Sequence, residues 1–139
     1  MKKVVKLLFS LGLCLIMASC VFEEKAKIFL SAQPINKNNS IFVDEKPIFR
    51  IRQRIYFVLI SKEEIENPKL KLQVLKLDKK APFHGIKSAL GIDINRGLHK
   101  QVVKDYFVVH KAGSYVIRVF SYDNLDNPIA QEYFWVEEL

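Results

Sequence analysis

Apolar and polar residues alternate over most of this chain, in short segments separated by turn-forming residues. A two-residue period is the mark of a half-buried β-strand, and the 3.6-residue period of a helix is almost absent after residue 25. We therefore expect an all-β domain, a sandwich or a small barrel, with about seven strands. The expected strands are residues 26–32, 47–60, 69–78, 90–94, 102–110, 114–123 and 129–137.

The C-terminal part of the chain carries a more specific pattern. Gly113 and Tyr115 form a Gly-x-Tyr sequence at the start of an expected strand, and residues 121–136 follow as a final hairpin. This pattern resembles bacterial immunoglobulin-like and PKD-like domains. The resemblance implies an immunoglobulin-like β-sandwich in which the Tyr115 hydroxyl closes a corner by bonding to the backbone upstream. The chain departs from antibody domains in having no paired cysteines and in placing Trp135 in the last strand.

Three arginines occupy every second position from residue 50 to residue 54 of the expected strand 47–60, and the positions between and beside them are apolar except for Gln53. If this strand forms a hairpin with the strand 69–78, the inward faces of the two agree, and two lysines join the arginines on the outer face. Such a row of cations suits an acidic partner, a phosphate or an anionic lipid. The alternative is an ordinary solvated strand face that hinders sheet-to-sheet aggregation. The candidate partner- or anion-binding residues are Arg50, Arg52, Arg54, Lys69 and Lys71.

The first nineteen residues differ in kind from the rest. Three lysines precede an apolar stretch at residues 7–17, which is shorter than the roughly 20 residues of a bilayer-spanning helix. The sequence Met17-Ala18-Ser19-Cys20 then resembles the lipobox of bacterial lipoproteins, in the relaxed form of spirochaete lipoproteins, with Met17 in place of the usual leucine. The resemblance implies cleavage before Cys20 and a diacylglycerol on its sulfur. The alternatives are an ordinary signal peptide with a chance cysteine, or an uncleaved anchor.

This reading divides the chain into three parts. Residues 1–19 are the cleaved signal peptide, residues 20–25 are the lipidated cysteine and a short tether, and residues 26–139 are the sandwich domain. Five tether residues after Cys20 reach less than about 20 Å, so the domain is expected close to the bilayer. Cleavage would remove three lysines and lower the formal charge from +7 to +4, a mildly basic balance that predicts no nucleic-acid partner.

The chain offers little chemistry for catalysis or for metal binding. Cys14 would leave with the signal peptide and Cys20 would carry lipid, so no thiol remains for a disulfide, a nucleophile or a metal. The spacing of His84, His99 and His110 matches no metal motif. No nucleophile elbow, zinc-protease or phosphate-loop motif is found. We expect no cofactor, no metal and no enzymatic activity.

Two further segments are candidates for function. We interpret residues 79–100 as a long loop with a short strand at 90–94, which caps an open end of the sandwich. Aromatic residues near the C-terminus form an exposed patch if Phe134 points inward, and exposed aromatic patches mark partner sites. That patch would contain Tyr122, Tyr133 and Trp135.

The function that these patterns favour is a non-catalytic, lipid-anchored envelope protein that binds or scaffolds another envelope protein. The lipid on Cys20 would attach the protein to a membrane, and the expected location is the outer membrane. The short tether favours an accessory subunit of a periplasmic or outer-membrane assembly. Two alternatives stay open: a surface lipoprotein that binds a host or environmental ligand, and a small-ligand carrier or enzyme with a pocket under the loop 79–100.

Overall fold

The computed structural model describes residues 25–35, 47–80 and 85–138, and these residues form eight β-strands. The all-β class predicted from the alternation is confirmed, with one strand more than the seven expected. The predictions on the signal peptide and on Cys20 lie outside the described residues and stay predictions. The strands are β1 (Ala26–Ser31), β2 (Ile48–Arg50), β3 (Arg54–Ser61), β4 (Lys69–Leu77), β5 (Ile86–Asn95), β6 (Val102–Val108), β7 (Gly113–Ser121) and β8 (Ala130–Glu137).

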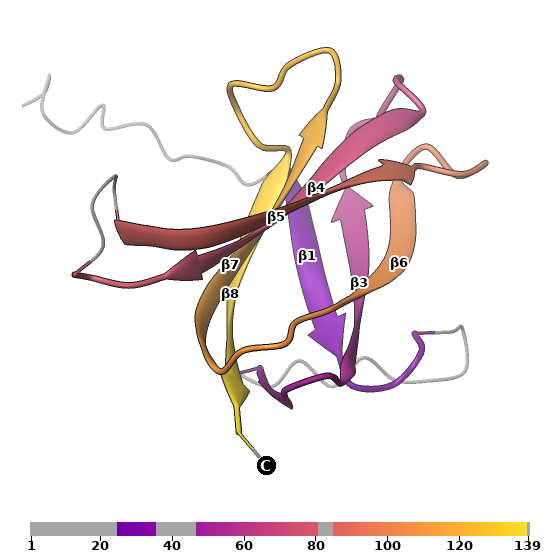
Figure 1. Cartoon of the computed structure of the whole chain (residues 1–139). Helices are drawn as coiled ribbons and strands as arrows, with labels where there is room; N and C mark the ends of the chain where they lie inside the picture. The colour runs from indigo at the N-terminus through magenta and orange to yellow at the C-terminus, as the bar shows by residue number, and fades with distance from the viewer. Residues whose placement is uncertain (1–24, 36–46, 81–84, 139) are drawn as a thin grey trace, which may run out of the picture.

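The strands form two sheets that lie face to face (Figure 1). One sheet has the order β1-β3-β6, and the other has the order β2-β8-β7-β4-β5, in which β2 runs parallel to β8 and all other neighbours are antiparallel. This is the immunoglobulin arrangement, in which strands A, B and E face strands G, F and C, with an added strand beside C as in variable domains. The predicted immunoglobulin-like β-sandwich is confirmed.

The core lies between the sheets and is centred on Phe134 of β8, whose side chain is 0% exposed. Its ring centroid lies 5.3 Å from that of Tyr115, 5.5 Å from that of Phe107 and 6.2 Å from that of Phe49. These rings come from four strands and from both sheets, and each fully buried aromatic contributes about 1.5–3 kcal/mol by leaving water. Fully buried aliphatic side chains surround them, among them Ile28, Ile55, Leu59, Leu70, Leu72, Ile117 and Val119.

The predicted hairpin between the strands 47–60 and 69–78 was wrong. β3 pairs with β1 and β6, whereas β4 pairs with β5 and β7, so residues 62–68 carry the chain from one sheet to the other. Ile65 is buried in this crossing, and its amide donates to the carbonyl of Lys100 at 2.8 Å. The alternation specifies which side chains of a strand face the core. It does not specify the neighbouring strand, because the same side chains face inward whichever strand lies alongside.

The predicted single strand over residues 47–60 is two strands, β2 and β3, in different sheets. Between them Arg52 adopts the left-handed conformation with a φ of 61°, which is uncommon for a residue other than glycine. The amide of Ile51 donates to the carbonyl of Glu137 at 3.1 Å, and the amide of Arg52 donates to that of Val109 at 2.8 Å. The turn therefore ties the end of β8 to the segment that follows β6, and this tertiary contact offsets its local strain.

Residues 79–100 are not the long loop that was expected, because ten of these residues form the edge strand β5. β5 pairs with β4 along its length, and the turn before it is closed by the Asp78 amide, which donates to the carbonyl of Gly85 at 2.7 Å. Gly85 has a φ of 75°, a conformation that favours glycine. Residues 81–84 of the expected loop lie outside the described residues. The alternative of a small-ligand carrier or enzyme with a pocket under residues 79–100 stays a prediction.

The start of β7 has the corner that the resemblance implies. The Tyr115 hydroxyl donates to the carbonyl of Lys111 at 2.7 Å, and the ring stacks on Phe134 with an interplanar angle of 15°. Gly113 precedes it with a φ of 146°, where side chains other than hydrogen are disfavoured. A Cβ built on Gly113 would also lie 2.7 Å from Cε of Lys76, the mobile part of a flexible side chain. Backbone strain therefore sets the cost of a substitution here.

Replacing Tyr115 by phenylalanine should lower the free energy of unfolding by about 0.5–1.5 kcal/mol, because the Lys111 carbonyl loses its donor. Burial raises the pKa of the Tyr115 hydroxyl, so the folded state resists its ionisation. Stability should accordingly fall as the pH rises above about 10, where tyrosines of the unfolded chain ionise first. Urea unfolding at pH 7 and at alkaline pH measures both effects, and Tyr115→Phe should show a shallower alkaline loss than the wild type.

Gly113→Ala should destabilise the domain by about 1–3 kcal/mol, because alanine is strained at a φ of 146°. Gly91→Ala is the matched control, since its added Cβ would make an ordinary 3.6 Å contact with Cε of Lys71 and its φ is not positive. We expect that control to be neutral or to stabilise by up to about 1 kcal/mol. Equal losses in the two variants, measured by thermal unfolding, would contradict the strain at Gly113.

Candidate binding surfaces

The structure does not bring the five predicted cationic residues into one ladder. Arg50 lies on the edge strand β2, Arg52 lies in the turn, and Arg54 starts β3 in the other sheet. Lys69 and Lys71 lie on β4, in a different sheet from Arg54. The expected single row was therefore wrong because the chain changes sheet within it, while a binding role for the individual residues stays a prediction.

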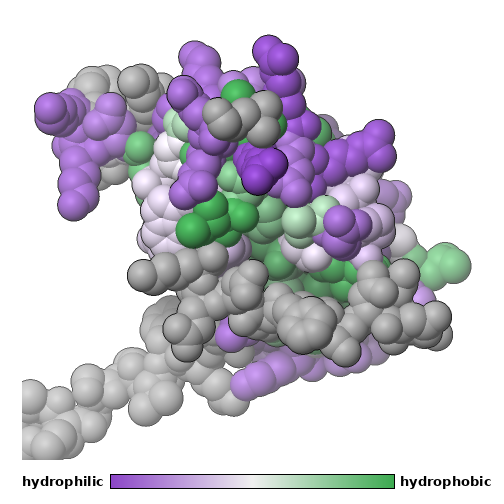
Figure 2. All heavy atoms as spheres, turned by 90° about the horizontal axis from the view of Figure 1, so that it is seen from below, coloured by the Kyte–Doolittle hydropathy of each residue, from purple (hydrophilic) through white to green (hydrophobic). Residues whose placement is uncertain are grey.

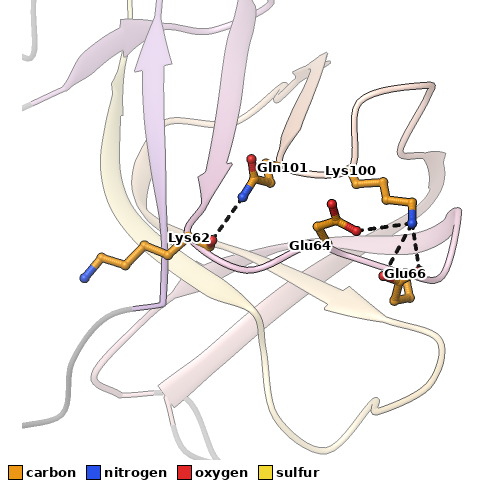
Figure 3. Close-up of polar contacts among 5 residues, drawn as sticks. All are labelled: Lys62, Glu64, Glu66, Lys100 and Gln101. Atoms are coloured by element: carbon orange, nitrogen blue, oxygen red, sulfur yellow. Dashed lines mark hydrogen bonds and ion pairs between the residues drawn. The ribbon is translucent and has the colours of Figure 1, made fainter.

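The end of the sandwich where the tether joins β1 is a network of paired charges (Figure 3). Nζ of Lys100 lies 3.2 Å from the Glu64 carboxylate and 3.1 Å from that of Glu66. These contacts lower the pKa of Glu66, and they raise the pKa of Lys100. The Lys62 amide donates to the carbonyl of Lys25 at 2.8 Å, which fixes the last tether residue. At this end, which we call the tether end, Lys25 and Lys100 are therefore each paired with glutamate.

The arginines lie at the opposite end of the sandwich, which we call the distal end. β1 and β3 are antiparallel, with Ala26 opposite Ser61, so Arg54 is at the far end of β3 from the tether. The eight residues of β3 place it about 23 Å away, at about 3.3 Å per residue. Figure 2 shows the molecule from the distal end, where hydrophilic side chains project beside hydrophobic ones.

An aromatic patch lies on the outer face of the five-stranded sheet at the distal end. Trp135 and Tyr133 of β8 are 41% and 48% exposed, on either side of the buried Phe134. Ile48 of β2 lies opposite Trp135 in the parallel pairing of β2 with β8, and its side chain is 52% exposed. Arg50, two residues further along β2, is also exposed. We call these four residues, Ile48, Arg50, Tyr133 and Trp135, the distal patch.

The predicted exposure of three aromatic residues is confirmed, but they do not form one patch. Tyr122 is exposed, yet it follows the opposite end of β7 and its hydroxyl donates to the carboxylate of Asp93. Only the pairing of β2 with β8 adds Ile48 and Arg50 to Tyr133 and Trp135. Sequence reasoning missed this grouping because a parallel contact between residues some ninety positions apart leaves no local signal.

A second surface was also missed, on the outer face of the three-stranded sheet. Its cations stand beside aromatic rings: Nζ of Lys27 lies 5.5 Å from the Phe29 centroid, and Cζ of Arg54 lies 5.0 Å from the Tyr106 centroid. Ile60 and Tyr106 are 42% and 46% exposed here. The pairing of β1, β3 and β6 makes their outward-facing residues neighbours, and we call this surface the basic face. Its residues are Lys27, Phe29, Arg54, Tyr56, Val58, Ile60, Lys104 and Tyr106.

The described ranges 25–35, 47–80 and 85–138 contain no group of three or more histidine, cysteine or carboxylate side chains that could hold a metal ion. Nor does any helix in them have the length and apolar character needed to cross a membrane. His84, one of the three histidines considered, lies outside these ranges.

The fold defines the class of this protein, an immunoglobulin-like β-sandwich with exposed aromatic surfaces on two outer faces. No protein-family model and no curated protein matches the chain. Among solved structures it is similar to the soluble domain of PmoD from Methylocystis sp. ATCC 49242 (Rockwell), with 15% sequence identity and a TM-score of 0.48 over 85% of this chain and 95% of that chain. At this level of similarity the likeness says nothing about the function of this chain.

Proposed function

We propose that this protein is a lipid-anchored, non-catalytic binding module of the cell envelope that holds a partner protein through the distal patch. The observation that carries the proposal is the grouping of an exposed tryptophan, tyrosine and arginine around Ile48. Tryptophan, tyrosine and arginine are the residue types that dominate the binding energy of protein interfaces.

The distal patch is rigid, which favours recognition. Tyr133 and Trp135 alternate with Phe134 and Val136, which are buried in the core, so the strand beneath them is fixed by packing. The Trp135 amide also donates to the carbonyl of Pro47 at 3.0 Å, which holds the start of β2 against β8. A preorganised surface loses less conformational freedom when it binds, and this raises affinity.

The position of the patch suits a protein that is held at a membrane. The lipid on Cys20 would hold the tether end within about 20 Å of the bilayer, because only five residues separate it from β1. The distal patch lies at the other end of the sandwich, where a partner can reach it. We propose the outer membrane as the location and an accessory role in a periplasmic or outer-membrane assembly, and the same patch would serve a surface lipoprotein that binds an external ligand.

Trp135→Ala should weaken partner binding by about thirtyfold, since truncation of a central interface residue typically costs 2 kcal/mol or more. Chemical crosslinking in intact cells followed by quantitative recovery of the bound partner measures the loss, and Tyr122→Ala serves as an exposed aromatic control. Both variants should unfold like the wild type. Recovery of the same partner at the same yield from Trp135→Ala would reject the distal patch as its site.

Protease treatment of intact cells decides which side of the outer membrane the domain faces. If the domain is an accessory subunit in the periplasm, it should survive shaving and be cut only after the outer membrane is opened. Cleavage in intact cells would instead support the surface lipoprotein. The binding result with Trp135→Ala is independent of that outcome.

A further inference from the structure

We propose that the basic face lies flat on the anionic membrane surface to which the lipid tethers the domain, which leaves the distal patch open to a partner. This inference rests on the proposed lipid anchor and adds a second, electrostatic contact with the same membrane. It assigns different partners to the two outer faces of the sandwich.

The first argument is the charge of the basic face. Lys27, Arg54 and Lys104 project from it, and no carboxylate of the described residues pairs with any of them. The strands β1, β3 and β6 contain one carboxylate, Asp105, and the alternation of β6 turns it away from the face. The cations at the tether end differ, because Lys25 and Lys100 are paired with glutamates.

The second argument is the mixture of side chains. Val58 is buried although it points away from the core, because Phe29 and Lys104 flank it in the register. Tyr106 packs against Tyr56 with a 5.7 Å centroid distance and stays half exposed. Tyrosine rings and long cationic side chains are suited to a bilayer interface, where the apolar part of each side chain meets lipid and its polar end stays in water.

The third argument is the length of chain between the lipid and the face. β1 is an edge strand of the same sheet, and Lys27 is seven residues from Cys20. A short tether raises the effective concentration of the face at the membrane into the millimolar range, so a weak attraction is enough to hold it there. The outer face of the other sheet lacks this advantage and carries the carboxylates of Asp93 and Glu137 beside its cations.

Single cysteines test the orientation, because the mature chain would have no other free thiol. Ile60→Cys and Tyr106→Cys place an environment-sensitive fluorophore on the basic face, and Tyr133→Cys places it on the distal patch. The purified lipoprotein is reconstituted in phosphatidylcholine vesicles with and without phosphatidylglycerol. We expect a blue shift, and quenching by nitroxide-labelled lipid, at positions 60 and 106 in the anionic vesicles and neither at position 133.

Charge variants test the cause of the orientation. Each cation near an anionic surface contributes about a fivefold preference, so Lys27→Gln, Arg54→Gln and Lys104→Gln together should lower the ratio of docked to undocked domains on the order of a hundredfold. Raising the salt from about 0.1 M to 1 M shortens the screening length from about 10 Å to 3 Å and should act in the same direction. The matched control, Lys69→Gln with Lys79→Gln and Lys80→Gln, removes equal charge elsewhere and should leave the quenching unchanged.

Four results would overturn the proposal, and they are distinguishable. Equal quenching at all three positions would refute the flat orientation, and quenching that ignores the charge variants would refute its electrostatic cause, while the lipid anchor stands in both cases. Protection of positions 60 and 106 in native envelopes but not in vesicles would show that a protein covers the basic face. A mature mass without a diacylglycerol would remove the anchor and with it this inference.

Discussion

Phe134→Ala should lower the free energy of unfolding by about 3–5 kcal/mol, a large part of the roughly 5–15 kcal/mol that stabilises a domain of this size. The side chain is 0% exposed and contacts the rings of Phe49, Phe107 and Tyr115, which belong to three other strands. Its removal leaves a cavity where the two sheets meet, and residues 25–35, 47–80 and 85–138 contain no cysteine that could limit the loss through a disulfide. Urea unfolding followed by circular dichroism measures the shift in midpoint.

The neighbouring residue on the same strand provides the control for Phe134→Ala. Tyr133 points to the opposite side of β8 and is half exposed, so Tyr133→Ala should change the free energy of unfolding by much less, within about 1 kcal/mol. A loss as large as that of Phe134→Ala would mean that the outer face of β8 is packed against something in the folded protein. The pair of variants therefore tests both the core and the exposure of the distal patch.

Cys20→Ser should abolish lipid attachment completely, because the diacylglycerol is expected on the cysteine sulfur and serine offers none. Two or more acyl chains hold a protein firmly on a bilayer, since each buried methylene contributes about 0.8 kcal/mol. Mass spectrometry of the protein recovered from the membrane fraction should show the lipid in the wild type and none in the variant. The mature form that begins at residue 20 should also be missing in the variant.

Cys14→Ser is the matched control for Cys20→Ser. Cys14 lies within the segment that is expected to be removed, so this variant should yield a mature protein of the same mass and the same membrane attachment as the wild type. A lipidated product that survives Cys20→Ser would contradict the predicted attachment site. A wild type with an unmodified thiol would leave an exported binding domain without the proposed anchor.

The elements could be predicted from the sequence wherever local alternation was enough. β1, β4, β6, β7 and β8 were each expected within a few residues of their bounds, and the inward side predicted for the strand 69–78 is the side of β4 that enters the core. The resemblance around Gly113 implied the corner that the Tyr115 hydroxyl closes. β5 was underestimated because only residues 90–94 were expected as a strand, and Lys87, Ser88 and Ala89 before them show no clear alternation of apolar and polar residues.

The candidate site was predicted less well, because it depends on which strands lie together. The arginine row was read as one face of one strand, and the left-handed turn at Arg52 distributes its members over two sheets. The distal patch requires β2 to run parallel to β8, and the basic face requires β1, β3 and β6 to share a sheet. No local pattern encodes either contact.

By itself the sequence determined the all-β class, the faces that enter the core and the residues available for chemistry, because alternation and side-chain type are local properties. The tertiary structure alone decided which outer faces are aromatic or basic, and how far each lies from the tether. The physical reason is that a strand presents the same inward side to any neighbour, whereas a surface is the sum of side chains from strands far apart in the chain. Those neighbours are selected by the packing of the whole core around Phe134.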